Sequence, residues 1–321
     1  MFLDLNKITQ LVIEPSSYCN LHCPQCPRFG EKGFLDKHLN QGHLDFSRLA
    51  DNLNLNFLPN LDYVKLEGDY GDPAMNPDLL NIIDFFKHCN QVDLVTNGSI
   101  RSPKWFEKLA TRKNVEVTFS IDGFEDTNHI YRINADWNKI MNNAKSFISA
   151  GGKPIWKMIV FKHNQHQVEQ VRKFSQDLGF AKFETIFSDR DFFHNIWPVY
   201  IDGEYQYDLE IADNLQLNTK AHVLANNVEK FTSPKCKWIE KGKLYINYLG
   251  CLLPCCMTAG TTWKDTIAER LFRKIIGSTN DINLYQNSID KIAQSDFYKF
   301  ALEDSFASIK TCHNLCIKHC S

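Results

Sequence analysis

The sequence lacks an excess of charge of either sign, a long apolar run and a secretory N-terminus. Its 321 residues include 36 Lys and Arg against 38 Asp and Glu, a net charge of −2. A nucleic-acid surface needs a clustered basic excess, so we expect no nucleic-acid partner. No apolar run approaches the roughly 18 residues of a membrane-spanning helix, and residues 1–7 show no basic stretch followed by an apolar one. We therefore expect a soluble, cytoplasmic protein with no membrane partner.

Cysteine, in contrast, is abundant and unevenly distributed. Three of the 11 cysteines lie between residues 19 and 26, one lies at position 89, and seven lie beyond residue 235. In a reducing cytosol, clustered cysteines indicate metal sites rather than disulfides. We therefore expect metal-binding regions near both ends of the chain.

Short apolar runs alternate with amphipathic stretches from residue 9 to about residue 187, which is typical of repeated βα units. The expected strands are 10–14, 63–67, 91–96, 115–121, 155–161 and 182–187, and the expected helices are about 47–54, 77–88, 103–110, 137–150 and 165–178. This series is shorter than that of a closed eight-unit barrel. The pattern predicts an α/β fold, a partial, open-sided (β/α)6 TIM-like barrel, with reactive groups on the loops after the carboxyl ends of the strands.

The pattern changes after residue 190. Residues 191–228 show few clear periods, and we interpret them as a bridging region. Alternating apolar residues at 244, 246 and 248, followed by a glycine at 250, predict a hairpin, and a helical segment is expected near 285–302. We therefore divide the chain into a barrel at 1–190, the bridging region at 191–228, and a small domain of a β-hairpin plus a helix at 229–321.

The first three cysteines directly follow the first expected strand. Cys19, Cys23 and Cys26 are separated by three and two residues, so one short loop offers three thiolates to one metal centre. A cluster with four irons ordinarily takes four thiolates, so three protein ligands leave one position for a small molecule. Half of a structural zinc site, a disulfide, or inert core thiols are the alternatives.

The spacing of these cysteines resembles the signature of the radical S-adenosylmethionine (SAM) superfamily, and the similarity spans most of residues 9–190. The resemblance implies that Cys19, Cys23 and Cys26 hold a 4Fe–4S cluster whose fourth iron is chelated by the methionine part of SAM. The reduced cluster would cleave SAM to a 5′-deoxyadenosyl radical, which removes a hydrogen atom from the substrate. A flavodoxin- or ferredoxin-type electron donor is implied as well.

The segment after the second expected strand resembles the glycine-rich, acidic segment that grips the amino group of SAM in that superfamily. Tyr70, Gly71 and Asp72 stand where the superfamily usually has Gly-Gly-Glu. Glycine allows close backbone approach to an ammonium, and a carboxylate adds a charged partner. Alone, the Gly-Asp-Pro sequence is also an ordinary turn.

Polar residues at the ends of the third and fourth expected strands complete the resemblance. It implies that Asn97, Ser120 and Asp122 line the SAM pocket and that Arg132 pairs with the SAM carboxylate. Asn-Gly and Asp-Gly are also turn sequences, which is the alternative for Asn97 and Asp122. The superfamily commonly has an aromatic residue against the adenine at the position of Gln25. Here we expect the backbone and apolar residues such as Ile159 or Phe161 on the fifth expected strand to hold the adenine instead.

The later cysteines resemble the auxiliary-cluster domains called SPASM, with two clusters, and twitch, with one. Few cysteines follow the hairpin, which favours the one-cluster form. Cys256 could replace Cys255 because adjacent strand residues face opposite ways, and Cys320 could replace Cys316. Cys251 has no assigned role, and a four-cysteine zinc site is the alternative. The expected ligands of the auxiliary 4Fe–4S cluster are Cys236, Cys255, Cys312 and Cys316.

The resemblance implies a radical SAM enzyme, and we expect an oxidoreductase that dehydrogenates a small molecule, with the auxiliary cluster accepting the electron. A peptide maturase that forms a crosslink or an epimerised residue is one alternative. A non-catalytic iron–sulfur or zinc protein is the other. The catalytic acid or base is not identified. Five residues lie on or just after the fifth and sixth expected strands, where a substrate could bind, and each could equally be a solvated surface group: Lys157, His163, His166, Asp189 and Arg190.

Overall fold

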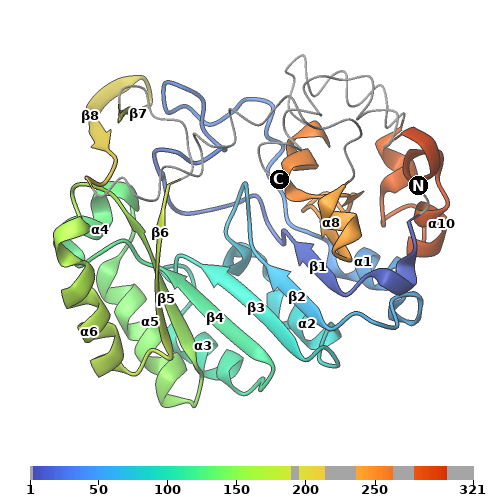
Figure 1. Cartoon of the computed structure of the whole chain (residues 1–321), viewed down its shortest axis with the longest axis horizontal. Helices are drawn as coiled ribbons and strands as arrows, with labels where there is room; N and C mark the ends of the chain where they lie inside the picture. Colours follow the sequence, from blue (N-terminus) through green and yellow to red (C-terminus); the bar gives the residue numbers. More distant parts are fainter. Residues whose placement is uncertain (1–2, 189–194, 214–235, 263–277, 302–321) are drawn as a thin grey trace.

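Six parallel strands form the centre of the molecule (Figure 1). The computed structural model describes residues 3–188, 195–213, 236–262 and 278–301. Each strand after the first pairs in parallel with the strand that precedes it in the chain. The predicted α/β fold and its six strands are therefore confirmed. The strands are β1 (Gln10–Ile13), β2 (Tyr63–Leu66), β3 (Gln91–Thr96), β4 (Val115–Ser120), β5 (Pro154–Val160) and β6 (Lys182–Phe187).

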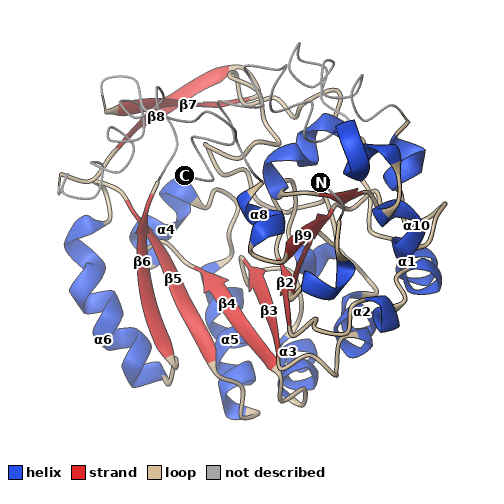
Figure 2. Cartoon of the chain, turned by 45° about the vertical axis from the view of Figure 1, so that its right-hand side comes forward, coloured by secondary structure: helices blue, strands red, loops and turns tan. Residues whose placement is uncertain are grey.

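Helices cover one face of this sheet (Figure 2). On β4, Phe119 faces them and packs against Phe106 with ring centroids 5.3 Å apart. Aspartates that accept a backbone N–H begin two of the helices, and Gly179, at a φ of 95°, ends another. The helices are α1 (Phe46–Asn52), α2 (Leu79–Phe85), α3 (Pro103–Ala110), α4 (Glu125–Tyr131), α5 (Trp137–Ser149) and α6 (Val168–Leu178).

Helix α4 was not among the predicted elements. It is only seven residues long, and its N-cap, Phe124, provides no side-chain hydrogen bond. These features leave little local signal in the sequence. The helix matters for the site because its C-cap residue is Arg132.

The predicted C-terminal hairpin is present, and it joins the barrel sheet. Strand β9 (Lys243–Ile246) pairs in parallel with β1, and β10 (Leu252–Leu253) pairs antiparallel with β9. The described sheet thus has eight strands in the order β10-β9-β1-β2-β3-β4-β5-β6. The first strand of the barrel is therefore an interior strand, and the hairpin lies directly beside the loop that carries the first three cysteines.

The described part of the bridging region, residues 195–213, contains two strands that the sequence analysis did not predict. Strands β7 (Ile196–Ile201) and β8 (Glu204–Glu210) form an antiparallel hairpin. At the tip of the hairpin, the Gly203 N–H donates to the Lys32 carbonyl at 2.9 Å. At its other end, the Lys162 N–H donates to the Glu210 carbonyl at 3.1 Å. These contacts reach distant segments, so the local sequence pattern does not reveal them.

Shorter helical segments complete the described chain. The segment predicted near 285–302 contains α10 (Ile289–Ala293) and a π-helical turn at Phe297–Ala301. No helix among the described residues is long and apolar enough to span a membrane. The other short helical segments are α8 (Lys237–Glu240) and the 3-10 turns Leu5–Lys7, Leu55–Phe57, Pro73–Met75, Gln165–Gln167, Cys256–Thr262 and Thr279–Ile282.

Candidate active site

The loops after β1, β2, β3 and β4 meet at the carboxyl ends of the strands. The loop after β1 carries Cys19, Cys23 and Cys26, and a turn in which the Cys26 N–H donates to the Cys23 carbonyl at 3.0 Å holds the last two together. All three residues are half-buried. The thiols thus lie where reactive groups are expected in a barrel of this kind.

Two of the three sulfurs have nitrogen donors near them. The Leu21 N–H and the Asn97 side-chain amide donate to Cys19 Sγ, at 3.4 and 3.7 Å. Arg132 Nη1 lies 3.9 Å from Cys23 Sγ. Burial raises the pKa of Cys19 to about 12 and that of Cys23 to about 11, so both are thiols at neutral pH unless a metal displaces the proton.

These residues fit an iron–sulfur cluster in their donor chemistry. Each of the eight described cysteines is a thiol rather than half of a disulfide. Within the described ranges, no three Cys, His, Asp or Glu side chains converge as ligands of a single ion. A cluster binds its thiolates through different irons, and hydrogen bonds to sulfur are a common way to tune it. Cys19, Cys23 and Cys26 would hold such a cluster.

The glycine-rich loop after β2 lies directly against the cysteine loop. A Cβ on Gly71 would lie 2.0 Å from the Ser16 carbonyl oxygen, and one on Gly68 would lie 2.1 Å from the Gly71 carbonyl oxygen. The Asp72 N–H donates to the Tyr18 carbonyl at 2.8 Å. Only residues without a side chain allow this approach. The close contact explains why glycine is required at position 71.

The Asp72 carboxylate holds the ends of β2 and β3 together. It is buried and accepts hydrogen bonds from the N–H groups of Ala74 and Asn97, at 2.9 and 2.7 Å, and from the Thr96 hydroxyl, at 2.9 Å. Burial raises the pKa of Asp72, and these donors oppose that shift. Since a carboxylate has about four acceptor positions, little capacity is left for a ligand. Tyr70 likewise has a buried side chain and contributes its backbone N–H.

Asn97 connects this loop to the cysteines. Its side-chain amide donates to Cys19 Sγ and, at 2.9 Å, to Asn20 Oδ1, while its own Oδ1 accepts from the Ser99 N–H. Ser120 ends β4 opposite Lys157 of β5 and makes no side-chain hydrogen bond among the described residues. Asn97 therefore positions the first cysteine, whereas Ser120 stands on the open face of the sheet.

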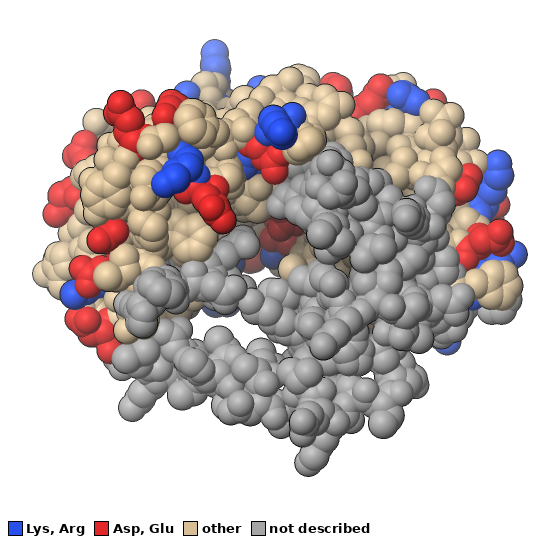
Figure 3. Space-filling view, turned by 90° about the horizontal axis from the view of Figure 1, so that it is seen from above, with Lys and Arg blue, Asp and Glu red and all other residues tan. Residues whose placement is uncertain are grey.

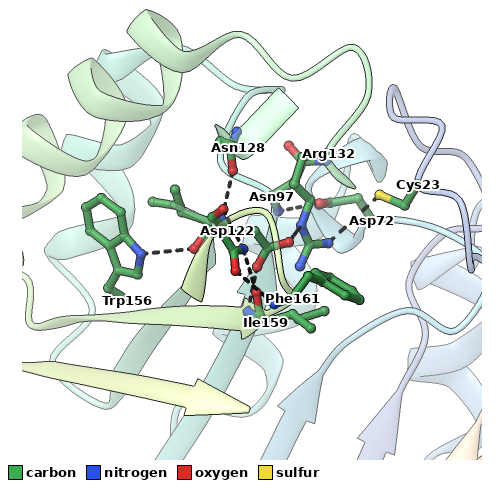
Figure 4. Close-up of polar contacts among 11 residues, drawn as sticks. Cys23, Asp72, Asn97, Asp122, Asn128, Arg132, Trp156, Ile159 and Phe161 are labelled. Carbon is green, nitrogen blue, oxygen red and sulfur yellow. Dashed lines mark hydrogen bonds and ion pairs between the residues drawn. The ribbon is translucent and has the colours of Figure 1, made fainter. Parts of the chain in front are cut away.

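The buried Asp122 and the half-buried Arg132 form an ion pair beside Cys23 (Figure 4). Arg132 Nε donates to one Asp122 oxygen at 2.6 Å, and the Ile159 N–H donates to the other at 2.7 Å. Burial opposes the charge of Arg132, but Asp122 and the nearby Cys23 raise its pKa. The guanidinium is therefore charged and held at the edge of the cysteine loop, with further N–H donors for an anion.

The residues expected near the adenine are not equally accessible. Phe161 is fully buried beneath the β7–β8 hairpin, and its ring packs at a tilt against Tyr131 with ring centroids 4.7 Å apart, which leaves none of its side chain exposed. Ile159 is half-buried. Gln25 is buried and accepts a hydrogen bond from the Ser188 hydroxyl at 2.8 Å, which ties the cysteine loop to the end of β6.

Charged side chains line the face of the sheet opposite the helices. The aligned positions of β4, β5 and β6 carry Ser120, Lys157 and Glu184. Lys65 pairs with Glu67 at 2.5 Å, and Lys182 pairs with Glu184, whereas Lys157 is in no ion pair among the described residues. Burial and Lys65 lower the pKa of Lys157. Figure 3 shows acidic and basic side chains in a recess of the face above the strands.

The two histidines predicted near the substrate lie after β5. His163 is stacked on the buried Phe161 ring at 5.6 Å, and burial lowers its pKa to about 4. His166 lies in the 3-10 turn that precedes α6. Neither is in the cysteine site. Asp189 and Arg190 lie outside the described residues.

The described cysteines of the second group have different neighbours. Burial raises the pKa of Tyr298, and the nearby Cys236, Cys255 and Cys251 raise it further. Cys256 instead has Asp69 and Glu67 near it. Cys236, Cys251 and Cys255 are thus close to Tyr298, and Cys256 is close to the acidic residues of the loop after β2. The remaining predicted ligands, Cys312 and Cys316, and the alternative Cys320 lie outside the described residues.

The sequence analysis did not identify one residue of the site, Glu14. Glu14 follows β1 immediately and is fully buried, with the Tyr70 N–H donating to its carboxylate at 2.6 Å. The available signal was a single carboxylate at the end of an apolar strand, five residues before Cys19. A charge in that position needs a buried partner.

Comparison with known proteins finds solved structures with a similar fold. No protein-family model matches the chain, and no curated protein sequence matches it. Among solved structures, Streptococcus suis SuiB bound to S-adenosylmethionine is similar with a TM-score of 0.60 and 16% identity, over 91% of this chain and 67% of SuiB. The enzyme anSMEcpe with bound AdoMet is similar with a TM-score of 0.56 and 16% identity, over 91% and 82%. Both are radical SAM enzymes, and this chain has their fold.

Proposed function

We propose that this protein is a radical SAM enzyme. The observation that carries the proposal is that four loops at the carboxyl ends of the strands are hydrogen-bonded into one site around the cysteines. Asp72 is bonded to Asn97, Asn97 to Cys19, and Arg132 to Cys23. A scaffold or electron carrier would not need the second, third and fourth of these loops. The shared fold with SuiB and anSMEcpe supports the same conclusion.

Each loop has a role in this proposal. Cys19, Cys23 and Cys26 would hold a 4Fe–4S cluster, which when bound supplies the electron that cleaves SAM to methionine and a hydrogen-abstracting 5′-deoxyadenosyl radical. Backbone carbonyls of residues 68–72 would accept from the SAM ammonium, because the Asp72 carboxylate is already occupied by three donors. Arg132, oriented by Asp122, would hold the SAM carboxylate.

We further propose dehydrogenation of a small polar molecule, with an auxiliary 4Fe–4S cluster at the second cysteine group accepting the electron. Cys236 and Cys255 would be two of its ligands, since both are buried and lie near Tyr298. The charged inner face of the barrel suits a polar substrate, with Lys157 available to an anionic group. A flavodoxin- or ferredoxin-type protein would supply the electrons.

Peptide modification is the second candidate. It is favoured by a specific observation: two of the similar structures have a bound peptide, SuiB with its precursor peptide SuiA and anSMEcpe with the Cp18Cys peptide, at TM-scores of 0.54 and 0.55. A short precursor gene beside the gene for this protein would favour this candidate. Neighbouring genes for sugar enzymes would favour dehydrogenation.

The decisive experiment is anaerobic reconstitution with iron and sulfide, followed by dithionite and SAM. We expect 5′-deoxyadenosine from the wild-type protein and none from Cys23→Ala. Cys89→Ala is the matched control, since Cys89 lies in the core away from the site, and it should retain the activity. An inactive wild-type protein, or an unchanged Cys23→Ala variant, would refute the proposal. Iron analysis giving about eight irons per chain would support two clusters, and about four would support one.

A further inference from the structure

The C-terminal hairpin reaches into the predicted SAM site through one buried tyrosine. Tyr245 of β9 is fully buried, and its hydroxyl lies 3.2 Å from a Glu14 carboxylate oxygen and 3.1 Å from an Asp69 carboxylate oxygen. Tyr245 and Glu14 are far apart in sequence, but β9 pairs with β1, and the Glu14 N–H donates to the Ile246 carbonyl at 2.8 Å. The hairpin thus contacts both the end of β1 and the loop after β2.

Two carboxyl groups share one phenol in this arrangement. A tyrosine hydroxyl has one hydrogen, so it can donate a hydrogen bond to only one of them and can accept one only from a protonated form of the other. Burial, followed by the charge of Asp69, raises the pKa of Glu14, which favours a proton on Glu14. Tyr245 then accepts from Glu14 and donates to Asp69, and all three groups are satisfied.

These bonds fix consecutive residues of the glycine-rich loop. Glu14 accepts from the Tyr70 N–H at 2.6 Å, and Tyr245 holds the side chain of Asp69. The next residues, Gly71 and Asp72, lie against Ser16 and Tyr18. Residues 14–18 and 69–72 therefore run side by side, and the Glu14–Tyr245–Asp69 contact holds the end of this alignment that is farther from the cysteines.

We propose that Tyr245 and Glu14 are positioning residues of the SAM site, through which the C-terminal hairpin holds residues 69–72 in the arrangement that binds the amino group of SAM. The inference rests on the proposed function. It assigns to the hairpin a role in SAM binding that is separate from any metal it carries. Neither residue contacts the ligand itself.

The test compares Tyr245→Phe, which removes only the hydroxyl, with Tyr248→Phe on the same hairpin. Tyr248 is equally buried and also lies near Glu14, but its hydroxyl has no hydrogen-bond partner among the described residues, so the control removes a hydroxyl without removing a hydrogen bond. The first measurement is amide hydrogen exchange at Tyr70 in the reconstituted protein before SAM is added. Exchange should rise about fivefold to tenfold in Tyr245→Phe, corresponding to about one hydrogen bond, and stay unchanged in Tyr248→Phe.

The second measurement is the Kd of the reconstituted protein for two ligands by calorimetry. SAM carries the amino acid that residues 69–72 would hold, and 5′-methylthioadenosine lacks it. In Tyr245→Phe, the Kd for SAM should rise about fivefold while the Kd for 5′-methylthioadenosine stays within about twofold. Glu14→Gln, which keeps an acceptor for the Tyr70 N–H, should lose less SAM affinity than Glu14→Ala, and it serves as the second variant if Tyr245→Phe does not fold.

Two results would overturn this inference alone. One is wild-type exchange and wild-type SAM affinity in Tyr245→Phe. The other is an equal loss of affinity for both ligands together with a lower melting temperature, because that is the effect of general destabilisation. A wild-type holoprotein that binds no SAM would instead overturn the proposed function, and this inference with it.

Discussion

Replacing Gly71 with alanine tests the contact between the glycine-rich loop and the cysteine loop. The added Cβ would lie 2.0 Å from the Ser16 carbonyl oxygen and 2.7 Å from the carbonyl carbons of Ser16 and Ser17. All three atoms belong to the backbone, so no side chain can rotate away. The two segments must therefore separate by about 1 Å or more to reach an ordinary contact distance.

The separation has a cost that follows from the hydrogen bonds across the contact. The Asp72 N–H to Tyr18 carbonyl distance of 2.8 Å would become too long for a hydrogen bond, and the 2.6 Å bond from the Tyr70 N–H to Glu14 would be strained. A neutral bond contributes about 1 kcal/mol and one to a carboxylate about 1.5–3 kcal/mol. We expect Gly71→Ala to lower the free energy of unfolding by about 2–4 kcal/mol and to raise the Kd for SAM at least about tenfold.

The assay is urea unfolding of the purified protein, followed by SAM calorimetry on the reconstituted protein. Gly30→Ala is the matched control on the cysteine loop, because its added Cβ would meet nothing nearer than 3.9 Å. It should change stability by no more than about 0.5 kcal/mol. If Gly71→Ala matches Gly30→Ala in both measurements, the loop contact is not a constraint on the site and the reasoning is wrong.

Three further predictions concern charged groups. Asp122→Asn leaves the half-buried Arg132 without its carboxylate and should cost about 1.5–3 kcal/mol in urea unfolding, with part of the loss recovered in Asp122→Asn/Arg132→Met. Additive losses would contradict the ion pair. Burial and Lys65 lower the pKa of Lys157, so Lys157 should react with acetic anhydride faster than exposed lysines at pH 8.5. Lys65→Met should slow the reaction of Lys157. Equal reaction rates for Lys157 and the exposed lysines would contradict the lowered pKa. Burial lowers the pKa of His163 to about 4, below its unfolded value near 6.5, so the unfolded state binds more protons between these values and stability should fall as pH decreases from about 6.5 to 4. His163→Phe should flatten that dependence in urea midpoints, and an unchanged slope would assign it to another group.

The order of the barrel elements was predictable from sequence because its signals are local. The six strands lie within about one residue of the predicted ones, since apolar alternation and turn residues act over short windows. Helix α4 and the β7–β8 hairpin were missed for the converse reason. Both depend on contacts with distant segments, such as the Tyr207 hydroxyl on the Ile130 carbonyl.

The sequence by itself determined which residues could hold a metal and where along the chain they stand. The spacing of Cys19, Cys23 and Cys26 is a local property, because it places three thiols on one short loop whatever the rest of the fold does. Only the tertiary structure decided which partners meet them. Arg132 reaches Cys23 across 109 residues, and Tyr245 reaches Glu14 across 231. Parallel pairing brings distant strand ends to one edge of the sheet, and no periodicity in the sequence records which side chains will meet there.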